Sequence, residues 1–309
     1  MKGRALSIWE LPFATRRRLI VNTDAKNEAD DQYAIVHALL SPSLDVRGVV
    51  AAHFGFRRGF DSMRQSRQEI DLLVDLLGMK GEVRTEDGAP MPLPDAATPV
   101  DSPGAQLIIA EALREEAGPL FVAFLGPLTD MAAALLLEPR IAQRDVTVVW
   151  IGGGPYEGFG EAGQGRPEFN LSNDIAAANI VFASGVRLWQ IPMSTYRLVN
   201  VSYAELYRDV RGCGEIGRYL VDQLVEFNQQ RAFVGYNPEW HCLGDSPAIG
   251  VVLSPGCGWH SERPAPQFRS DGSYDESAPH RPIRVYHSID SRFIIGDLFA
   301  KLQAHAAKN

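Results

Sequence analysis

The sequence predicts an α/β protein whose open, mostly parallel, Rossmann-like sheet carries helices on both faces. Segments 19–21 and 46–52 are almost wholly apolar and rich in β-branched residues. Segments 31–40 and 61–77 carry apolar residues at helical spacing. Strands that alternate with helices are typical of parallel sheets, and such strands are apolar throughout because helices cover both of their faces.

The rest of the chain continues this alternation. The helix over 31–40 stops at Ser41-Pro42, and the helix over 61–77 is closed by Gly78. Further helices are expected over 105–117, 131–137, 175–184, 203–207, 216–233 and 291–305, and further strands over 120–125, 146–151, 186–191 and 284–287.

Proline, glycine and polar residues indicate three loops, over 90–103, 158–165 and 255–282. No internal repeat or linker interrupts the chain. We therefore expect a single domain over 1–309, with residues 1–18 as a surface segment before the first strand.

Composition excludes several classes of protein. The net charge of −8 gives the 309-residue chain no general attraction for nucleic acid or anionic lipid. No apolar stretch is long enough to span a membrane, and residues 1–18 lack the apolar core of a signal peptide. The three cysteines are widely spaced, without a CxxC pair, which favours a reducing compartment. We expect a cytoplasmic protein that acts on a small molecule.

Three aspartates follow the first predicted strand. Asp24 comes directly after the strand, and Asp30 and Asp31 begin the next helix. Ligands of open parallel sheets bind beyond the carboxyl ends of the strands. Three neighbouring carboxylates repel one another unless a cation or protons compensate, and oxygen ligands favour calcium or magnesium. The cluster therefore indicates a divalent-metal site where Asp24 deprotonates a water.

Another interpretation of these aspartates stays open at this point. Asp30 and Asp31 at a helix N-terminus also interact favourably with the helix dipole and its unpaired amides.

Segments 22–31, 125–130, 152–154 and 168–170 together resemble the inosine-uridine-preferring nucleoside hydrolase family. The resemblance extends over residues 19–302, with the motifs in the family's order. It implies calcium-dependent hydrolysis of the N-glycosidic bond of a ribonucleoside or related N-riboside, releasing ribose and the base. It also implies a homodimer or homotetramer.

The resemblance assigns a role to each matching residue. It implies calcium ligands at Asp24, Asp31, the backbone carbonyl of Leu125, and Asp245, with Asp24 also the general base. It implies ribose contacts from Asp30, Glu168 and Asn170.

The residues themselves leave other interpretations open for some of these positions. Glu168 and Asn170 lie two apart in a segment expected to be extended, so both side chains would share one face. Alone, they would be a solvated loop charge and a turn residue. Asp245, followed by Ser246-Pro247, also fits a helix N-cap.

The chain departs from the family pattern around the departing base. The loop 25–29 is about two residues longer than in the family, and we expect it to place Lys26, Asn27 or Glu28 over the pocket. Gly244 stands where many purine-preferring members carry a histidine proposed to protonate the base. We consider His241 as the acid and Trp240 as a stacking partner for the base. A packed or surface histidine remains the alternative for His241.

His53, after the second strand, is a further candidate for substrate binding.

Three other functions compete with hydrolysis. A ribose- or nucleoside-binding protein without turnover would explain Gly244. A metal-dependent phosphoesterase usually needs histidine ligands for a second metal, and the chain has no HxD or HxH pair. A Rossmann dehydrogenase is disfavoured because Gly152–Gly154 lacks the GxGxxG register.

Overall fold

A single eight-stranded sheet forms the centre of the molecule, which we describe from a computed structural model covering residues 7–13, 16–56, 59–115, 118–156, 167–232, 238–277 and 281–308. The strand order is β3-β2-β1-β4-β5-β6-β12-β9. All neighbouring strands are parallel except β12 and β9, which are antiparallel. The strands are β1 (Arg17–Thr23), β2 (Leu44–Ala51), β3 (Thr85–Asp87), β4 (Leu120–Phe124), β5 (Val146–Ile151), β6 (Arg187–Ile191), β9 (His260–Pro264) and β12 (Pro282–Tyr286). The predicted fold class is confirmed.

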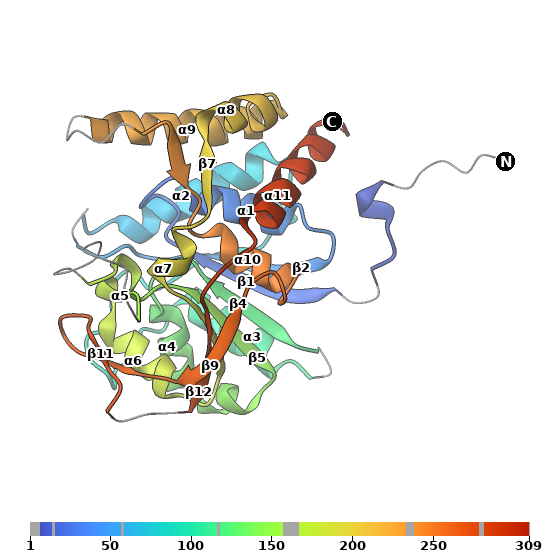
Figure 1. Ribbon diagram of the computed structural model, residues 1–309. Helices are drawn as coiled ribbons and strands as arrows, with labels where there is room; N and C mark the ends of the chain where they lie inside the picture. The colour runs from blue at the N-terminus through green and yellow to red at the C-terminus, as the bar shows by residue number, and fades with distance from the viewer. Residues whose placement is uncertain are drawn as a thin grey trace.

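Helices cover both faces of this sheet (Figure 1). One face carries α1 (Asp31–Leu39), α2 (Ser62–Leu76), α10 (Ser246–Leu253) and α11 (Ser291–Ala306), with α9 (Gly214–Ala232) outside α1 and α2. The other carries α3 (Pro103–Leu113), α4 (Thr129–Leu137) and α6 (Ile175–Ala183).

Successive residues of β1 alternate between these two layers. Leu19 and Val21 belong to the core on the α1 side, whereas Ile20 belongs to the core on the α4 side, and all three are fully buried. This double burial explains why the central strands read as continuous apolar runs.

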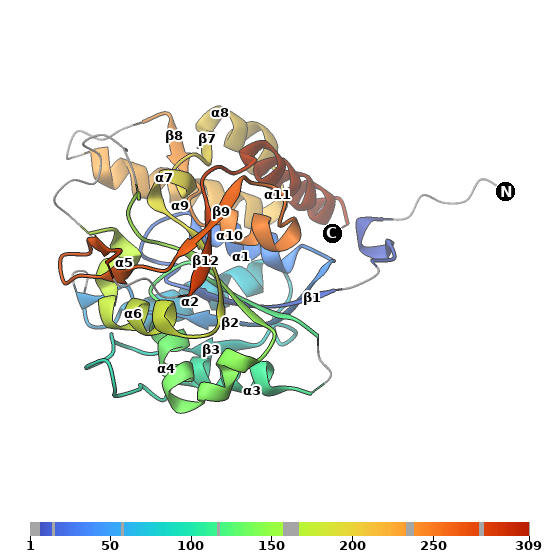
Figure 2. The same ribbon diagram turned by 60° about the horizontal axis from the view of Figure 1, so that its bottom comes forward.

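Smaller elements surround the sheet. Figure 2 shows the ribbon of β7 (Asn200–Ser202) and β8 (Trp240–Cys242) near α7 (Met193–Tyr196) and α9, at the opposite end of the view from α3 and α4. The remaining elements are α5 (Phe169–Asn173), α8 (Tyr203–Glu205), a π-helical turn (Leu206–Val210), β10 (Gln267–Phe268), β11 (Tyr274–Asp275) and 3-10 turns at Ile8–Glu10 and Pro139–Gln143.

The structure differs from the sequence-based predictions at several places, and the short elements α5, α7, β7 and β8 were among those not predicted. Segment 255–282, expected to be irregular, contains β9, β10 and β11. Strand β9 lies at the edge of the sheet and pairs only with β12 among the described strands, so its polar sequence lacks the apolar pattern of a central strand. Strand β3 was not expected, and helix α10 was indicated only by the N-cap interpretation of Asp245. The expected surface segment over 1–18 is too long by its last residues, because β1 begins at Arg17 and Arg18 is buried. Arg18 Nη2 donates to Glu111 Oε2 at 2.7 Å. The glycine-rich loop 158–165 lies outside the described residues.

No helix in the described part of the chain has both the length and the apolar character that a bilayer crossing requires.

The strand order defines where a ligand would bind. After β1 the chain proceeds to β2 and β3 on one side, whereas after β4 it proceeds to β5 and β6 on the other. The carboxyl ends of β1 and β4 therefore flank a topological switch point, where open α/β sheets bind ligands. Asp24 directly follows β1, and Leu125 directly follows β4.

Candidate active site

A cavity of about 740 Å³ opens at the switch point. Carboxylates from the ends of β1, α1 and α10 form one part of its lining. Another part comes from α7, α9 and the β7–β8 ribbon. Of the residues predicted from the sequence, the cavity is lined by Asp24, Asn27, Asp30, Asp31, Leu125, Glu168, Asn170, Trp240, His241 and Asp245.

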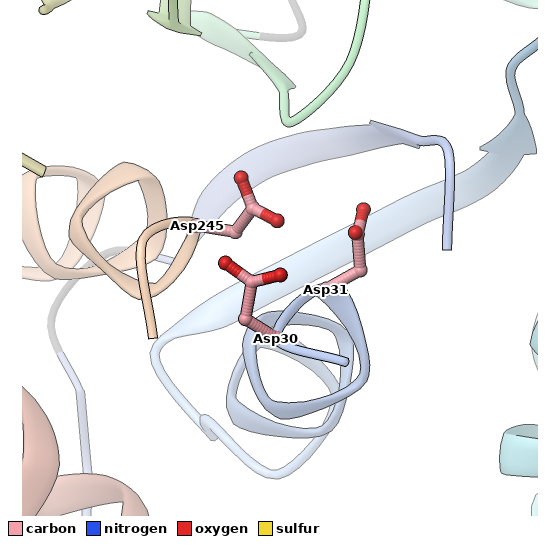
Figure 3. Close-up of side chains that lie close together, drawn as sticks. All are labelled: Asp30, Asp31 and Asp245. Atoms are coloured by element: carbon pink, nitrogen blue, oxygen red, sulfur yellow. The ribbon is translucent and has the colours of Figure 1, made fainter. Parts of the chain in front are cut away.

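Three of the carboxylates converge on one space. Oxygen atoms of Asp30, Asp31 and Asp245 lie within 4.8 Å of one another, and all three residues are buried. Figure 3 shows them reaching towards each other from the first turn of α1 and the start of α10. Asp30 and Asp245 occupy helix N-cap positions, yet neither side chain makes a capping hydrogen bond. Helix capping therefore does not account for these carboxylates.

Asp24 adds a fourth carboxylate to this part of the cavity. Its side chain is 2% exposed, and its Oδ2 has no hydrogen-bond partner among the described residues. A Cβ atom at Gly126 would come within 2.8 Å of its Oδ1, so the glycine allows the close approach. A buried acceptor without a partner costs free energy, so this oxygen points to a ligand that the protein binds here.

Burial and mutual repulsion determine the charge of this cluster. Loss of solvent raises the pKa of Asp24, Asp30 and Asp245 well above the usual range, and the neighbouring carboxylates raise it further. Burial raises the pKa of Asp31 to about 6, although the Thr23 hydroxyl, which donates to Asp31 Oδ1, favours the charged form. A divalent cation would relieve this repulsion and keep the carboxylates ionised.

The donors around the cluster fit such a cation. Leu125 lines the same cavity as Asp24, Asp31 and Asp245, so the four residues predicted to hold the metal reach one cavity from distant parts of the chain. All are oxygen donors, which calcium and magnesium prefer.

Glu168 and Asn170 form the adjoining wall, in a conformation that differs from the prediction. Glu168 is the N-cap of α5 and accepts a hydrogen bond from Leu171 N at 3.0 Å, and Asn170 lies inside this one-turn helix rather than in an extended strand. A helix of five residues leaves too little periodicity to be recognised in the sequence.

Hydrogen bonds fix both side chains. Glu168 Oε2, which accepts from Leu171 N, also accepts a hydrogen bond from Gly153 N at 2.9 Å. Tyr196 Oη donates to Glu168 Oε1 at 3.0 Å. Burial raises the pKa of Glu168. Asn170 Nδ2 donates to the carbonyls of Leu125 and Ile151 at 2.5 and 2.9 Å.

Tyr196 and Arg231 line the cavity but were not predicted from the sequence. Tyr196 follows β6 in the short helix α7, at the same edge of the sheet as Asp24. The one feature of the sequence that could have indicated Tyr196 is its position shortly after the predicted strand 186–191. Arg231 lies near the end of α9, far from any strand end, and no sequence signal marked it.

His241 lines the cavity, as expected, and Trp240, which is 42% exposed, lies beside it in β8. Asn228 Nδ2 donates to Tyr203 Oη at 2.8 Å, which turns Asn228 Oδ1 towards His241 Nδ1 at 3.1 Å. The imidazole hydrogen therefore lies on Nδ1, and Nε2 is the acceptor. Burial, together with the charge of Arg231, lowers the pKa of His241 to about 4, so the ring is neutral near pH 7.

His53 does not line the cavity, in contrast to the prediction. It is 1% exposed, accepts a hydrogen bond from Gly55 N at 3.2 Å through Nδ1, and contacts Thr129 Oγ1 at 2.8 Å through Nε2. Thr129 in turn donates to Asp174. His53 is thus a packed histidine that joins β2 to α4 and α6. Its partner Thr129 lies 76 residues further along the chain, so the local sequence could not indicate this role.

Comparison with known proteins agrees with this geometry. The sequence profile of the family described as inosine-uridine preferring nucleoside hydrolase matches residues 19–287. The chain is 28% identical over 250 residues to a pyrimidine-specific ribonucleoside hydrolase, RihA, of Salmonella newport, covering 73% of this chain and 76% of that protein. It is 29% identical over 248 residues to RihA of Escherichia coli O9:H4, with the same coverage.

Solved structures share the fold. A purine-preferring ribonucleoside hydrolase from Gardnerella vaginalis superposes with a TM-score of 0.73 at 22% identity, covering 95% of this chain and 100% of that one. An inosine-uridine preferring nucleoside hydrolase from Bacillus anthracis gives a TM-score of 0.70 at 17% identity, covering 93% and 99%.

Proposed function

Because this chain belongs to the inosine-uridine preferring nucleoside hydrolase family and is an N-glycosyl hydrolase by that membership, we propose that it hydrolyses ribonucleosides, or related N-ribosides, in a calcium-dependent reaction. The observation that carries the proposal is the buried cluster of Asp30, Asp31 and Asp245 at the switch point, in a cavity that is also lined by Asp24 with its unpartnered Oδ2.

The proposed calcium ligands are Asp24, Asp31, Asp245 and the carbonyl of Leu125. When bound, calcium would acidify water and polarise the ribose hydroxyls.

The residues of the chain perform the remaining tasks. The carboxylate of Asp24 accepts the proton of the attacking water. Asp30, Glu168 and Asn170 bind ribose hydroxyls and hold the anomeric carbon in position. The buried negative charge favours the oxocarbenium-like transition state of glycoside hydrolysis.

The contacts of the base are proposed to come from the loop 25–29 and the β7–β8 ribbon. Trp240 is available to stack on a ring, and Asn27 and His241 are available as polar contacts. The relatives bear names that specify pyrimidine or purine substrates, so both base classes are candidates.

A panel of uridine, cytidine, inosine and adenosine tests this function through release of reducing sugar and free base. We expect stoichiometric release of both products from at least one nucleoside in calcium buffer, and none in excess chelator. Binding without release of either product would instead establish a ribose- or nucleoside-binding protein, the alternative that Gly244 motivates. A Cβ atom at Gly244 would lie 3.1 Å from the Tyr196 ring, so a histidine is not easily placed there.

We also propose a cytoplasmic homodimer or homotetramer. Support for a reducing compartment comes from Cys213, Cys242 and Cys257, all of which are free thiols. Light scattering coupled to size-exclusion chromatography tests the assembly, and a monomer would contradict it.

A further inference from the structure

Arg231 places a permanent positive charge on the cavity wall beside His241. Its guanidinium carbon lies 4.6 Å from the centroid of the Phe227 ring, and Phe227 meets the His241 ring edge-to-face at 5.8 Å. Arg231 Nη2 donates to Glu28 Oε1 at 3.2 Å. These contacts hold the guanidinium between α9 and the loop that carries the metal cluster.

The proposed reaction needs positive charge, or a proton, on this side of the cavity. When the bond between the anomeric carbon and the base nitrogen breaks, the electron pair stays with the base, which becomes negative. Gly244 offers no side chain for this purpose, and neutral His241 has an acceptor, not a donor, at Nε2. Two arginines line the cavity, and Arg197 is exposed at the end of α7, whereas the guanidinium of Arg231 is held against Glu28 and Phe227. Arg231 is therefore the group suited to meet the departing base.

The guanidinium retains donors for such a contact. An arginine has five N–H groups, and Glu28 is the one hydrogen-bond acceptor that Arg231 contacts within the described ranges. The side chain is 39% exposed and lines the cavity, so a ligand can reach it.

We propose that Arg231 stabilises the negative charge of the departing base, in place of a proton-donating histidine. In this step the water oxygen bonds to the anomeric carbon, and its proton passes to Asp24. The bond to the base nitrogen breaks, the electron pair remains on the base, and the base accepts a hydrogen bond from the guanidinium. The base then receives its proton from solvent. This inference rests on the proposed hydrolysis.

The first test compares leaving groups in the calcium-loaded enzyme. Uridine and inosine lose poor leaving groups, whereas 4-nitrophenyl β-D-ribofuranoside loses a stable phenolate that needs no help. For Arg231→Gln we expect kcat/KM to fall ~100-fold for the nucleosides, as for loss of an oxyanion-stabilising donor, and less than ~5-fold for the nitrophenyl riboside. Arg231→Lys retains the charge and should recover part of the loss.

Arg208→Gln is the matched control, because Arg208 is 71% exposed and pairs with Asp209 on the π-helical turn. This variant should have the wild-type kcat/KM for all three substrates. Thermal unfolding at the wild-type temperature shows that Arg231→Gln is folded. In that folded variant, an equal loss of kcat/KM for all three substrates, or no loss, would overturn the inference. A wild-type protein that releases sugar from no substrate would instead remove the proposed function together with the inference.

The second test is the pH profile of nucleoside hydrolysis. A guanidinium keeps its proton throughout the accessible pH range. We therefore expect kcat not to decline as the pH rises from 6 to 9. A decline in this range that disappears in His241→Asn would identify protonated His241 as the acid and overturn the role of Arg231.

Discussion

Replacing Asp31 by asparagine should stabilise the metal-free protein, although Asp31 is a proposed metal ligand. The pKa of Asp31 rises from 3.8 to about 6 in the folded chain, mainly because the carboxyl is buried. The folded state therefore binds this proton more tightly than the unfolded state does, and the stability falls as pH rises from about 4 to about 6. This rise in pKa corresponds to ~3 kcal/mol of unfolding free energy. The protein has this contribution below about pH 4 and has lost it above about pH 6.

Asparagine removes this penalty with little change in shape. The Thr23 hydroxyl, which donates to Asp31 Oδ1, can donate to the amide oxygen instead. In chelator at pH 8, Asp31→Asn should therefore unfold at a temperature several degrees above wild type, given ~2–4 °C per kcal/mol for chains of this size class. At pH 4 the difference should vanish, because the wild-type carboxyl is then protonated.

Thermal unfolding with and without calcium is the assay. Calcium should raise the unfolding temperature of wild type at pH 8 far more than that of Asp31→Asn, which has lost a ligand charge. Asp75→Asn serves as control, since Asp75 is 59% exposed and only 3.7 Å from Lys80, and it should behave as wild type. If Asp31→Asn were less stable than wild type in chelator at pH 8, the argument from buried charge repulsion would be refuted.

Three further substitutions separate chemistry from structure. Asp24→Asn should lower kcat by ~10²–10⁴, the usual contribution of a general base, and near-normal turnover would exclude Asp24 from that role. Trp150→Phe removes a buried bond from Nε1 to the Gly126 carbonyl at 3.1 Å; denaturant titration should show a loss of about 2–4 kcal/mol, and an unchanged midpoint would contradict it. Glu168→Gln keeps the shape but loses the charge that accepts from Tyr196, so KM for nucleosides should rise more than kcat falls, and the reverse pattern would argue against ribose binding.

Much of the fold is readable from the sequence because β1, β4 and β5 are buried on both faces. Their apolar runs mark the strands, and residues directly after them, such as Asp24 and Leu125, inherit a place at the binding edge. Local pattern therefore indicated Asp24, whereas only the family resemblance gave Leu125 a role.

Other parts depend on contacts between distant segments. Asp245 joins the cluster from the start of α10, more than two hundred residues after Asp24, and only the family resemblance indicated it. Arg231 acquires its place from packing between α9 and Glu28. His53 has the chemistry of a pocket residue, but its partner Thr129 draws it into the core. Polar edge strand β9 lacked the periodicity on which the prediction depended.

The most direct test of the central claim is a calcium titration of the metal-stripped enzyme that follows release of reducing sugar from a nucleoside substrate. We predict that turnover is absent in chelator and rises in proportion to bound calcium, reaching its maximum at one ion per chain. Full turnover in excess chelator, with no calcium bound, would contradict the assignment of Asp24, Asp31 and Asp245 to a catalytic metal site.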